Sequence, residues 1–245
     1  MLTFFKKIRK SLIDPLPASK VDSSTRRYFL YAFGEVALVV IGILIALQIN
    51  NWNEERKAFK FEIQLLTEMR TAIKHDRKQI DLFLNNNEAY INSCQIILDH
   101  LEQNLPYHDS LPFWQTNYWW QLNLRQTAYE TAKEYGLHFI KDDTLRSLLT
   151  LIYQNDVKFI DDLDNRMSLY QHTAVEPYLL EHFSSIGTGS DMIPHDFESL
   201  RTDEKYKTIL RTKMDKLSWM NMIVSTRQER IEELDRRIKE EMKIK

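Results

Sequence analysis

The sequence YFLYAFGEVALVVIGILIALQI, at residues 28–49, decides how this chain is organised. These 22 residues carry a single charge, that of Glu35. As an α-helix they would extend about 33 Å, which is enough to cross a bilayer. The alternative is a buried helix of a soluble core, but core helices of this length rarely lack a polar stripe. The sequence therefore predicts a transmembrane helix here.

The charges on either side of this stretch predict its orientation. Seven basic and two acidic residues precede it, whereas the flank at residues 51–60 is nearly balanced. The positive-inside rule then predicts a cytoplasmic N-terminus and places residues 50–245 on the other side of the membrane. A cleaved signal peptide is the competing interpretation, but its hydrophobic region would be shorter and a small-residue cleavage site would follow. We therefore expect a retained signal anchor.

Residues 1–27 are expected to form a basic cytoplasmic segment. Residues 2–13 place four apolar side chains near one helical face and the basic side chains elsewhere, which suits a helix lying on an anionic membrane surface. A disordered basic tail is the alternative. A segment of this length has no room for a kinase, cyclase or methyl-accepting output domain, so we do not expect a conventional one-chain receptor.

One face of the predicted span combines a carboxylate with small side chains. At 100° per residue, five residues fall within about 60° of Glu35. This membrane stripe comprises Glu35, Leu38, Val39, Gly42, Ala46 and Ile49. Gly42 and Ala46 form a small-xxx-small pair that permits close helix approach, and an intramembrane carboxylate is costly without a partner. We expect the stripe to bind a second copy or another membrane protein; a surface-reaching or ion-conducting Glu35 is the alternative.

The composition outside the span favours an all-α domain. The chain of 245 residues has only 5 Gly and 6 Pro, and 28% of its residues are charged. A formal net charge of −2 argues against a nucleic-acid-binding protein. The single cysteine, Cys94, cannot form an intrachain disulfide and is expected to be a small buried residue, although an intermolecular bridge stays open.

Heptad spacing predicts a long helix directly after the span. Apolar residues recur at alternating intervals of four and three from Phe59 to Leu105, and only Arg70, Arg77 and Asn87 interrupt them. Such a sustained repeat indicates coiled-coil-like packing. No helix breaker separates the repeat from the span, so we expect one continuous helix that ends at the proline following Leu105.

The C-terminal part repeats the pattern. Apolar residues recur at the same intervals from Tyr206 to Ile238, interrupted by Lys213 and Arg227, which predicts a final helix beginning near Asp203. Because its neighbours are joined by short connections, we expect this helix to run antiparallel to the first and to return towards the membrane.

Two further helices are predicted between the long ones. The first covers about residues 113–135 and is capped by Gly136; the second starts at a capping Asp142 or Asp143 and is interrupted by Pro177. Residues 184–194 are rich in Gly and Ser and predict a loop. The chain is therefore expected to be all-α: a single transmembrane helix that continues into an antiparallel bundle of about four helices.

An aromatic cluster lies at the start of the predicted second helix. A partner-binding patch is one interpretation, since aromatic residues are enriched at interface anchors. The residues of this patch would be Trp114, Tyr118, Trp119 and Trp120. The competing interpretation, which we favour, is that the rings close the core where the helices meet.

No pattern in the chain predicts catalysis, a cofactor or a metal site. Asp161, Asp162 and Asp164 cluster on one helix, but the Glu-x-x-His spacing of di-iron bundles is absent, and a solvated acidic face explains them better. The seven histidines are scattered, and no nucleophile elbow, P-loop or Cys-His signature occurs. We therefore expect a protein that is not an enzyme, and a small-molecule ligand stays undetermined.

The span and its flanks resemble a known sequence family. Residues 31–54, YAFGEVALVVIGILIALQINNWNE, together with the basic start FFKKIR at residues 4–9, are similar to an uncharacterised family of single-span membrane proteins of Bacteroidota-type bacteria. Residues 127–130, TAYE, and more loosely residues 142–146, DDTLR, resemble it too. The SG-containing stretch that often follows TAYE in the family is matched only in part, by EYG at residues 134–136.

The resemblance covers the first 60 residues well and the rest weakly. It implies an anchored protein of the bacterial inner membrane whose C-terminal domain faces the periplasm, and it brings no activity with it. Three functions then remain: a self-associating or docking scaffold, a sensory or accessory subunit with a ligand-binding bundle, and an ion-coupled motor or transport subunit that uses Glu35. We favour the scaffold.

Overall fold

The computed structural model describes residues 23–187 and 192–244. Within these ranges the chain is all-α, as the composition predicts, and its single β-type contact is an isolated bridge between Phe183 and Pro194. Residues 1–22 of the predicted cytoplasmic segment and residues 188–191 of the predicted loop lie outside the described residues.

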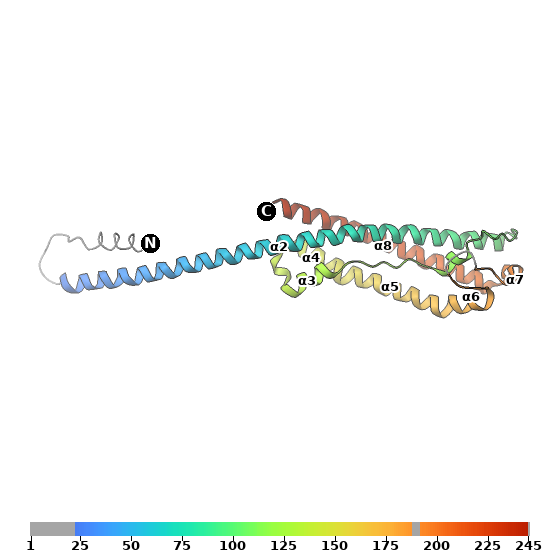
Figure 1. The fold of residues 1–245 in the computed structure, drawn as a ribbon, viewed down its shortest axis with the longest axis horizontal. Coiled ribbons are helices and arrows are strands. Elements are labelled where there is room, and N and C mark those ends of the chain that lie inside the picture. Colours follow the sequence, from blue (N-terminus) through green and yellow to red (C-terminus); the bar gives the residue numbers. More distant parts are fainter. Residues whose placement is uncertain (1–22, 188–191, 245) are drawn as a thin grey trace. The chain divides into compact units, whose positions relative to one another are not determined.

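Helices of three kinds follow one another along the chain (Figure 1). The α-helices are α2 (Ser23–Glu102), α3 (Thr127–Tyr135), α4 (Asp143–Thr150), α5 (Val157–Tyr170), α6 (Glu176–His182), α7 (Phe197–Thr202) and α8 (Glu204–Ile244). The 3-10 turns are η1 (Phe113–Asn117) and η2 (Leu137–Phe139), and the π-helical turns are η3 (Leu151–Asp156) and η4 (Gln171–Val175).

Helix α2 is the longest element, at 80 residues. It contains the predicted span, the membrane stripe and the first heptad repeat without a break, as expected from the absence of Pro and Gly after residue 42. Internal contacts nevertheless divide the chain into two compact units, Met1–Lys57 and Ala58–Lys245.

In the C-terminal unit, α2 and α8 run antiparallel, as predicted. Their ion pairs fix the direction: Arg70 contacts Asp235 at 3.3 Å, whereas further along α2 Glu102 contacts Arg211. Arg77, which also interrupts the predicted heptad, pairs with Glu232 of α8. Both arginines therefore lie at the edge of the α2–α8 contact, where their side chains are partly exposed. Other residues of α2 occupy the buried positions of this contact.

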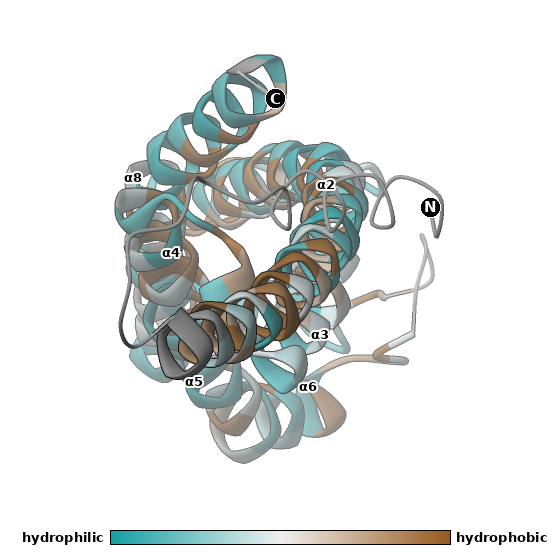
Figure 2. Cartoon of the chain, turned by 90° about the vertical axis from the view of Figure 1, so that its left-hand side faces the viewer, coloured by the Kyte–Doolittle hydropathy of each residue, from teal (hydrophilic) through white to brown (hydrophobic). Residues whose placement is uncertain are grey.

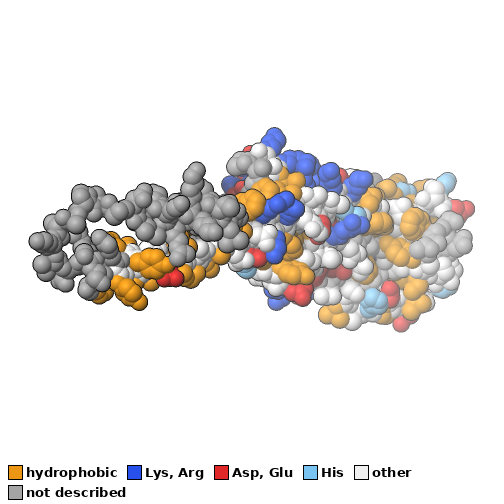
Figure 3. All heavy atoms as spheres, turned by 60° about the vertical axis from the view of Figure 1, so that its left-hand side comes forward, with side chains coloured by type: hydrophobic (Ala, Val, Ile, Leu, Met, Phe, Trp, Pro, Cys, Tyr) orange, Lys and Arg blue, Asp and Glu red, His pale blue; other side chains and the backbone are white. Residues whose placement is uncertain are grey.

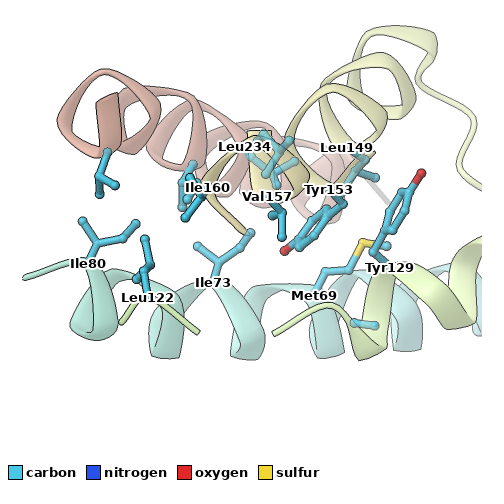
Figure 4. Packing of buried hydrophobic residues seen from close by; sticks show 14 of the residues in the cluster. Met69, Ile73, Ile80, Leu122, Tyr129, Leu149, Tyr153, Val157, Ile160 and Leu234 are labelled. Carbon is cyan, nitrogen blue, oxygen red and sulfur yellow. The ribbon is translucent and has the colours of Figure 1, made fainter. Parts of the chain in front are cut away.

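Two hydrophobic clusters make up the core of this unit. The larger one joins α2, α3, α4, α5 and α8 (Figure 4). The smaller one joins the end of α2 to α6, α7 and the start of α8. Figure 4 shows Met69, Ile73 and Ile80 of α2 on the side that faces Val157 and Ile160 of α5.

The heptad prediction is confirmed for α8. All eight apolar residues of the repeat are buried: Tyr206, Leu210, Leu217, Met220, Val224, Ile231, Leu234 and Ile238. A 41-residue helix with this stripe has enough apolar surface to be held by tertiary packing.

The predicted helix over residues 113–135 is wrong. Only η1 and the nine-residue α3 are helical, and residues 118–126 between them form no helix. The physical reason lies in α2, since the backbone N–H groups of Trp120 and Arg125 donate to the side chains of Asn87 and Asp76 instead of to helical carbonyls. Local propensity favours a helix here, and these tertiary hydrogen bonds override it.

The anchoring distances explain the shape of this segment. Asn87 and Asp76 are eleven residues apart, about 16 Å along a helix. Trp120 and Arg125 are five residues apart, and five residues reach about 16 Å only when extended. Residues 118–126 therefore run extended and antiparallel to α2, and Leu122 turns inwards to the core (Figure 4).

The predicted third helix is a run of α4, η3, α5, η4 and α6. Its N-cap is Asp142, one of the two residues predicted to cap it, and the Asp142 carboxylate accepts the N–H groups of Thr144 and Leu145. Pro177 stands in the first turn of α6, directly after η4. The interruption predicted at this proline is therefore confirmed, and it takes the form of a π-helical turn.

The caps of the other helices also follow the sequence. Gly136 ends α3 with φ +99°, and a Cβ added there would lie 2.5 Å from the ring of His138. Asp203 accepts the N–H of Lys205 at 2.8 Å and so caps α8. Arg201 of α7 donates to the carbonyl of His100, in the last turn of α2.

Candidate functional site

The membrane stripe lies on one face of an uninterrupted helix. All of its residues, from Glu35 to Ile49, have exposed side chains, and no other described residue covers them. A Cβ added at Gly42 would meet nothing within 4 Å. In Figure 2 the N-terminal part of α2 is coloured mainly hydrophobic, and Figure 3 shows hydrophobic side chains on the part of it that is in view. Within the described chain, the stripe is free to contact lipid or a second helix.

The aromatic patch predicted from the sequence is divided between the two cores. Trp114 packs against the smaller cluster and touches Tyr118 edge-on, with ring centroids 6.2 Å apart. Trp119 and Trp120 pack against the larger cluster instead. The indole N–H of Trp119 donates to Asp164 of α5 at 2.8 Å, so this ring holds the extended segment against α5.

Buried polar side chains of α2 hold the extended connection. Glu62, Asp76 and Asn87 are each 2% exposed or less. Each accepts a backbone N–H from the region after α2, in the order Lys141, Arg125 and Trp120. A buried acceptor on a helix face is costly unless it is bonded, and these groups are bonded to a segment that has unused donors. We refer to these three residues as the α2 acceptors.

Asp76 has a carboxylate whose pKa is shifted by its surroundings. Burial raises its pKa above the ordinary value, while the N–H of Arg125 and the neighbouring His75 oppose that shift. The His75 Nδ1 lies 3.6 Å from the Asp76 carboxylate. Tyr153, whose pKa is raised by its own burial and by the charge of Asp76, stacks on Tyr129 at 5.0 Å beside it.

Lys213, one of the two heptad interruptions in α8, is completely buried. Its ammonium donates to the backbone carbonyl of Thr116 and to Gln171 Oε1 at 3.4 Å. Gln171 belongs to the π-helical turn η4 and donates in turn to Asn117 at 2.6 Å. Asn117 then donates to the carbonyl of Ile186. This chain of hydrogen bonds, the Lys213 network, joins α8, η4, η1 and the loop after α6.

The Lys213 network holds a cation without a carboxylate contact in the described chain. Burial lowers the pKa of the ammonium to about 8, and the nearby Cys94 thiol partly opposes the shift. Burial raises the pKa of Cys94 to about 11, so this thiol is neutral near pH 7 and is a poor nucleophile. The expectation of a buried cysteine is confirmed.

Arg227, the other interruption of the heptad repeat in α8, is explained by the π-helical turn η3. Asp156 of η3 is 5% exposed and accepts two hydrogen bonds of 2.7 Å from Arg230. Arg227 Nε lies 3.2 Å from the same carboxylate, and its guanidinium stands over Phe159 at 4.9 Å. Each π-helical turn therefore carries one buried polar residue that contacts a cation of α8: Asp156 in η3 and Gln171 in η4. Single π-helical turns inside α-helices are often found at functional sites.

The three aspartates clustered on α5, Asp161, Asp162 and Asp164, have different surroundings. Asp164 accepts from Trp119, Asp162 pairs with Arg166 at 2.8 Å, and burial raises the pKa of Asp161. In residues 23–187 and 192–244, no three His, Cys, Asp or Glu side chains lie close enough together to hold a metal ion.

A groove of about 610 Å³ lies between the run η4–α6 and the first turns of α8. Its lining includes small and aromatic side chains, such as Ala174 and Tyr170, together with the charged side chains of Glu181, Glu204 and Lys205. The Lys205 ammonium stands over the ring of Tyr178 at 5.4 Å. No sequence pattern pointed to this groove, because its two sides are thirty residues apart.

These features define an all-α protein with one helix, among the described residues, that is long and apolar enough to cross a membrane. Residues 35–105 match a family model described as "Family of unknown function (DUF6090)". The predicted resemblance to an uncharacterised family is thereby confirmed over this range, which begins at Glu35 and ends three residues after α2. No curated protein and no solved structure matches the chain.

Proposed function

We propose that this protein is a membrane-anchored scaffold of the bacterial inner membrane. In this proposal residues 28–49 span the bilayer, the N-terminus is cytoplasmic, and the domain from residue 50 onwards stands in the periplasm. The scaffold associates with a second copy or with another membrane protein through the membrane stripe, and no catalytic activity is part of it.

The single observation that carries the proposal is the uncovered stripe. Glu35, Gly42 and Ala46 share a helix face that no described residue covers. Burying a carboxylate in hydrocarbon without a partner is unfavourable, and small residues allow a second backbone to approach. A partner helix satisfies both conditions, since it packs on Gly42 and supplies a hydrogen-bond donor to Glu35.

The use of polar groups in the C-terminal unit also supports a scaffold. Asp76, Asp156 and Lys213 are buried charges of the kind that a catalytic site would employ, and each is bonded to backbone or to a neighbouring helix. Such contacts stabilise one arrangement of the helices. A rigid domain of this kind presents a constant surface to partners.

Co-purification tests the proposal. The tagged full-length chain is extracted in mild detergent, its protein mass is measured by light scattering, and accompanying chains are identified. We expect either a multiple of 29.3 kDa or a stoichiometric membrane partner. A solitary chain of 29.3 kDa with no companion would contradict the scaffold.

A second candidate is a sensory or accessory subunit, and the groove beside α6 favours it. A ligand held between α6 and α8 would contact both helices, so it could alter their packing. An ion-coupled role for Glu35 belongs to the same class of membrane subunit. Glu35→Gln separates the hypotheses: loss of function with an intact complex indicates ion coupling, whereas loss of assembly supports the scaffold.

A further inference from the structure

Trp52 and Arg56 form a cation–π pair one helical turn apart, just after the predicted span. The guanidinium carbon of Arg56 lies 6.0 Å from the centroid of the Trp52 ring. Trp52 is nevertheless 61% exposed, and both residues belong to the N-terminal unit. An exposed indole with a cation beside it, directly after an apolar stretch, is suited to contact a partner outside the described chain.

The position of Trp52 matches one edge of a bilayer. Tyr31 and Trp52 are 21 residues apart in α2, which corresponds to about 31 Å of helix. The hydrocarbon core of a bilayer is about 30 Å thick, and Tyr and Trp are enriched at both of its interfaces. If the span crosses the membrane as proposed, Trp52 stands at the outer interface.

Arg56 then lies in the layer of lipid head groups. One turn beyond Trp52 adds about 6 Å along the axis, and each head-group layer is about 5–7 Å thick. The contact with the ring is a cation–π contact and uses no N–H donor, so the guanidinium N–H groups are available for bidentate bonding to phosphate. Arg56 forms no ion pair with another described residue, whereas its neighbour Lys57 is bound by Glu54 at 3.1 Å.

We propose that Trp52 and Arg56 form a binding site for the phosphate of an anionic phospholipid in the outer leaflet. The indole lies along the upper acyl chain and the glycerol backbone, and the guanidinium binds the phosphate. This inference rests on the proposed membrane anchoring, and it adds a specific lipid contact that fixes the depth of the helix.

Lipid retention tests the site. Full-length protein is purified in mild detergent with equal amounts of phosphatidylglycerol and phosphatidylcholine, and bound lipids are counted by native mass spectrometry. We expect the wild type to retain phosphatidylglycerol preferentially and Arg56→Gln to lower that retention about five-fold, the effect of one basic residue at a membrane surface. Trp52→Leu is expected to lower it as well, although the charge is intact.

Lys57→Gln is the matched control. It removes one positive charge from the adjacent position, but its ammonium is already paired, so we expect less than a two-fold change. Equal losses in Arg56→Gln and Lys57→Gln, or no preference for phosphatidylglycerol in the wild type, would overturn the proposal. Displacement of the lipid by millimolar inorganic phosphate would overturn it too, because the site would then bind free phosphate.

An alkaline wash of membranes separates this inference from the proposed function. If the wild type is extracted at high pH, the anchoring itself is wrong and the lipid site falls with it. If wild type and Arg56→Gln both resist extraction while their lipid retention is equal, only the lipid site is wrong. Resistance of both, with lipid lost only from the variant, supports both proposals.

Discussion

The carboxylate of Asp76, on the buried face of α2, accepts the backbone N–H of Arg125 at 2.9 Å. This contact places a charged group inside the core in order to hold a segment that has no helix of its own. Asn87 does the same for Trp120. A helix in this position would bond most of its N–H groups to its own carbonyls. The extended segment has no such carbonyls, and the side chains of α2 accept its N–H groups instead.

Replacing Asp76 separates its charge from its hydrogen bond. Asp76→Asn keeps an acceptor for Arg125 and removes the charge that burial disfavours, so we expect a higher melting temperature at pH 7. Asp76→Leu leaves the Arg125 N–H without its partner and should cost about 1–3 kcal/mol. Thermal unfolding followed by circular dichroism measures both, and equal destabilisation by the two variants would contradict this role.

The pH dependence of Asp76 follows from the direction of its pKa. Because the folded-state pKa is raised, the folded state binds a proton more readily than the unfolded state. The penalty is therefore present at neutral pH and is relieved as pH falls through the folded pKa. The advantage of Asp76→Asn over the wild type should shrink as pH falls from 7 to 4.

Asp156→Asn tests the contact between η3 and α8. The substitution leaves the guanidiniums of Arg227 and Arg230 without their carboxylate. Since both arginines are partly exposed, we expect a loss of about 1–3 kcal/mol, below the range for a fully buried pair. The control is Asp162→Asn, which breaks an exposed pair with Arg166 and should change stability by less than about 0.5 kcal/mol. Equal effects in urea unfolding would show that the π-helical turn does not depend on its ion pair.

Much of this fold follows from sequence periodicity. The length of α2, the buried stripe of α8 and the caps at Asp142 and Gly136 each depend on residues close together in the chain. The extended segment could not be predicted, because its hydrogen-bond acceptors lie some thirty to fifty residues earlier. The interruption of the heptad repeat at Asn87 was the available signal, since a polar residue at a core position requires a hydrogen-bond partner.

The features of the candidate site also fall into those that residue spacing predicts and those that depend on distant residues. The membrane stripe needs only helical geometry and was predictable from residue spacing. The Lys213 network was not, because its members come from four separate elements and include a backbone carbonyl. The π-helical turns that bring Gln171 and Asp156 towards α8 also leave no local pattern in the sequence.

Lys213 should make stability depend on pH in the opposite sense from Asp76. Its folded-state pKa of about 8 lies below the ordinary 10.5, so the stabilising contribution is complete above pH 10.5 and is lost as pH falls to about 8. The melting temperature of the wild type should therefore rise relative to Lys213→Met between pH 7 and 9. Cys94, Tyr170 and Tyr206 face the same cluster, and burial raises the pKa of each of them above this range, so they do not titrate between pH 7 and 9. A constant difference across this range would contradict a charged, buried Lys213.

The protein mass of the detergent-extracted chain, measured by light scattering for wild type, Gly42→Ile and Gly34→Ile, tests the central claim most directly. Both glycines lie in α2 with open space around them, but only Gly42 belongs to the membrane stripe. We expect the wild type and Gly34→Ile to share a mass above 29.3 kDa, whereas Gly42→Ile falls to that of the single chain. An unchanged assembly in Gly42→Ile, or equal losses in both variants, would contradict the central claim.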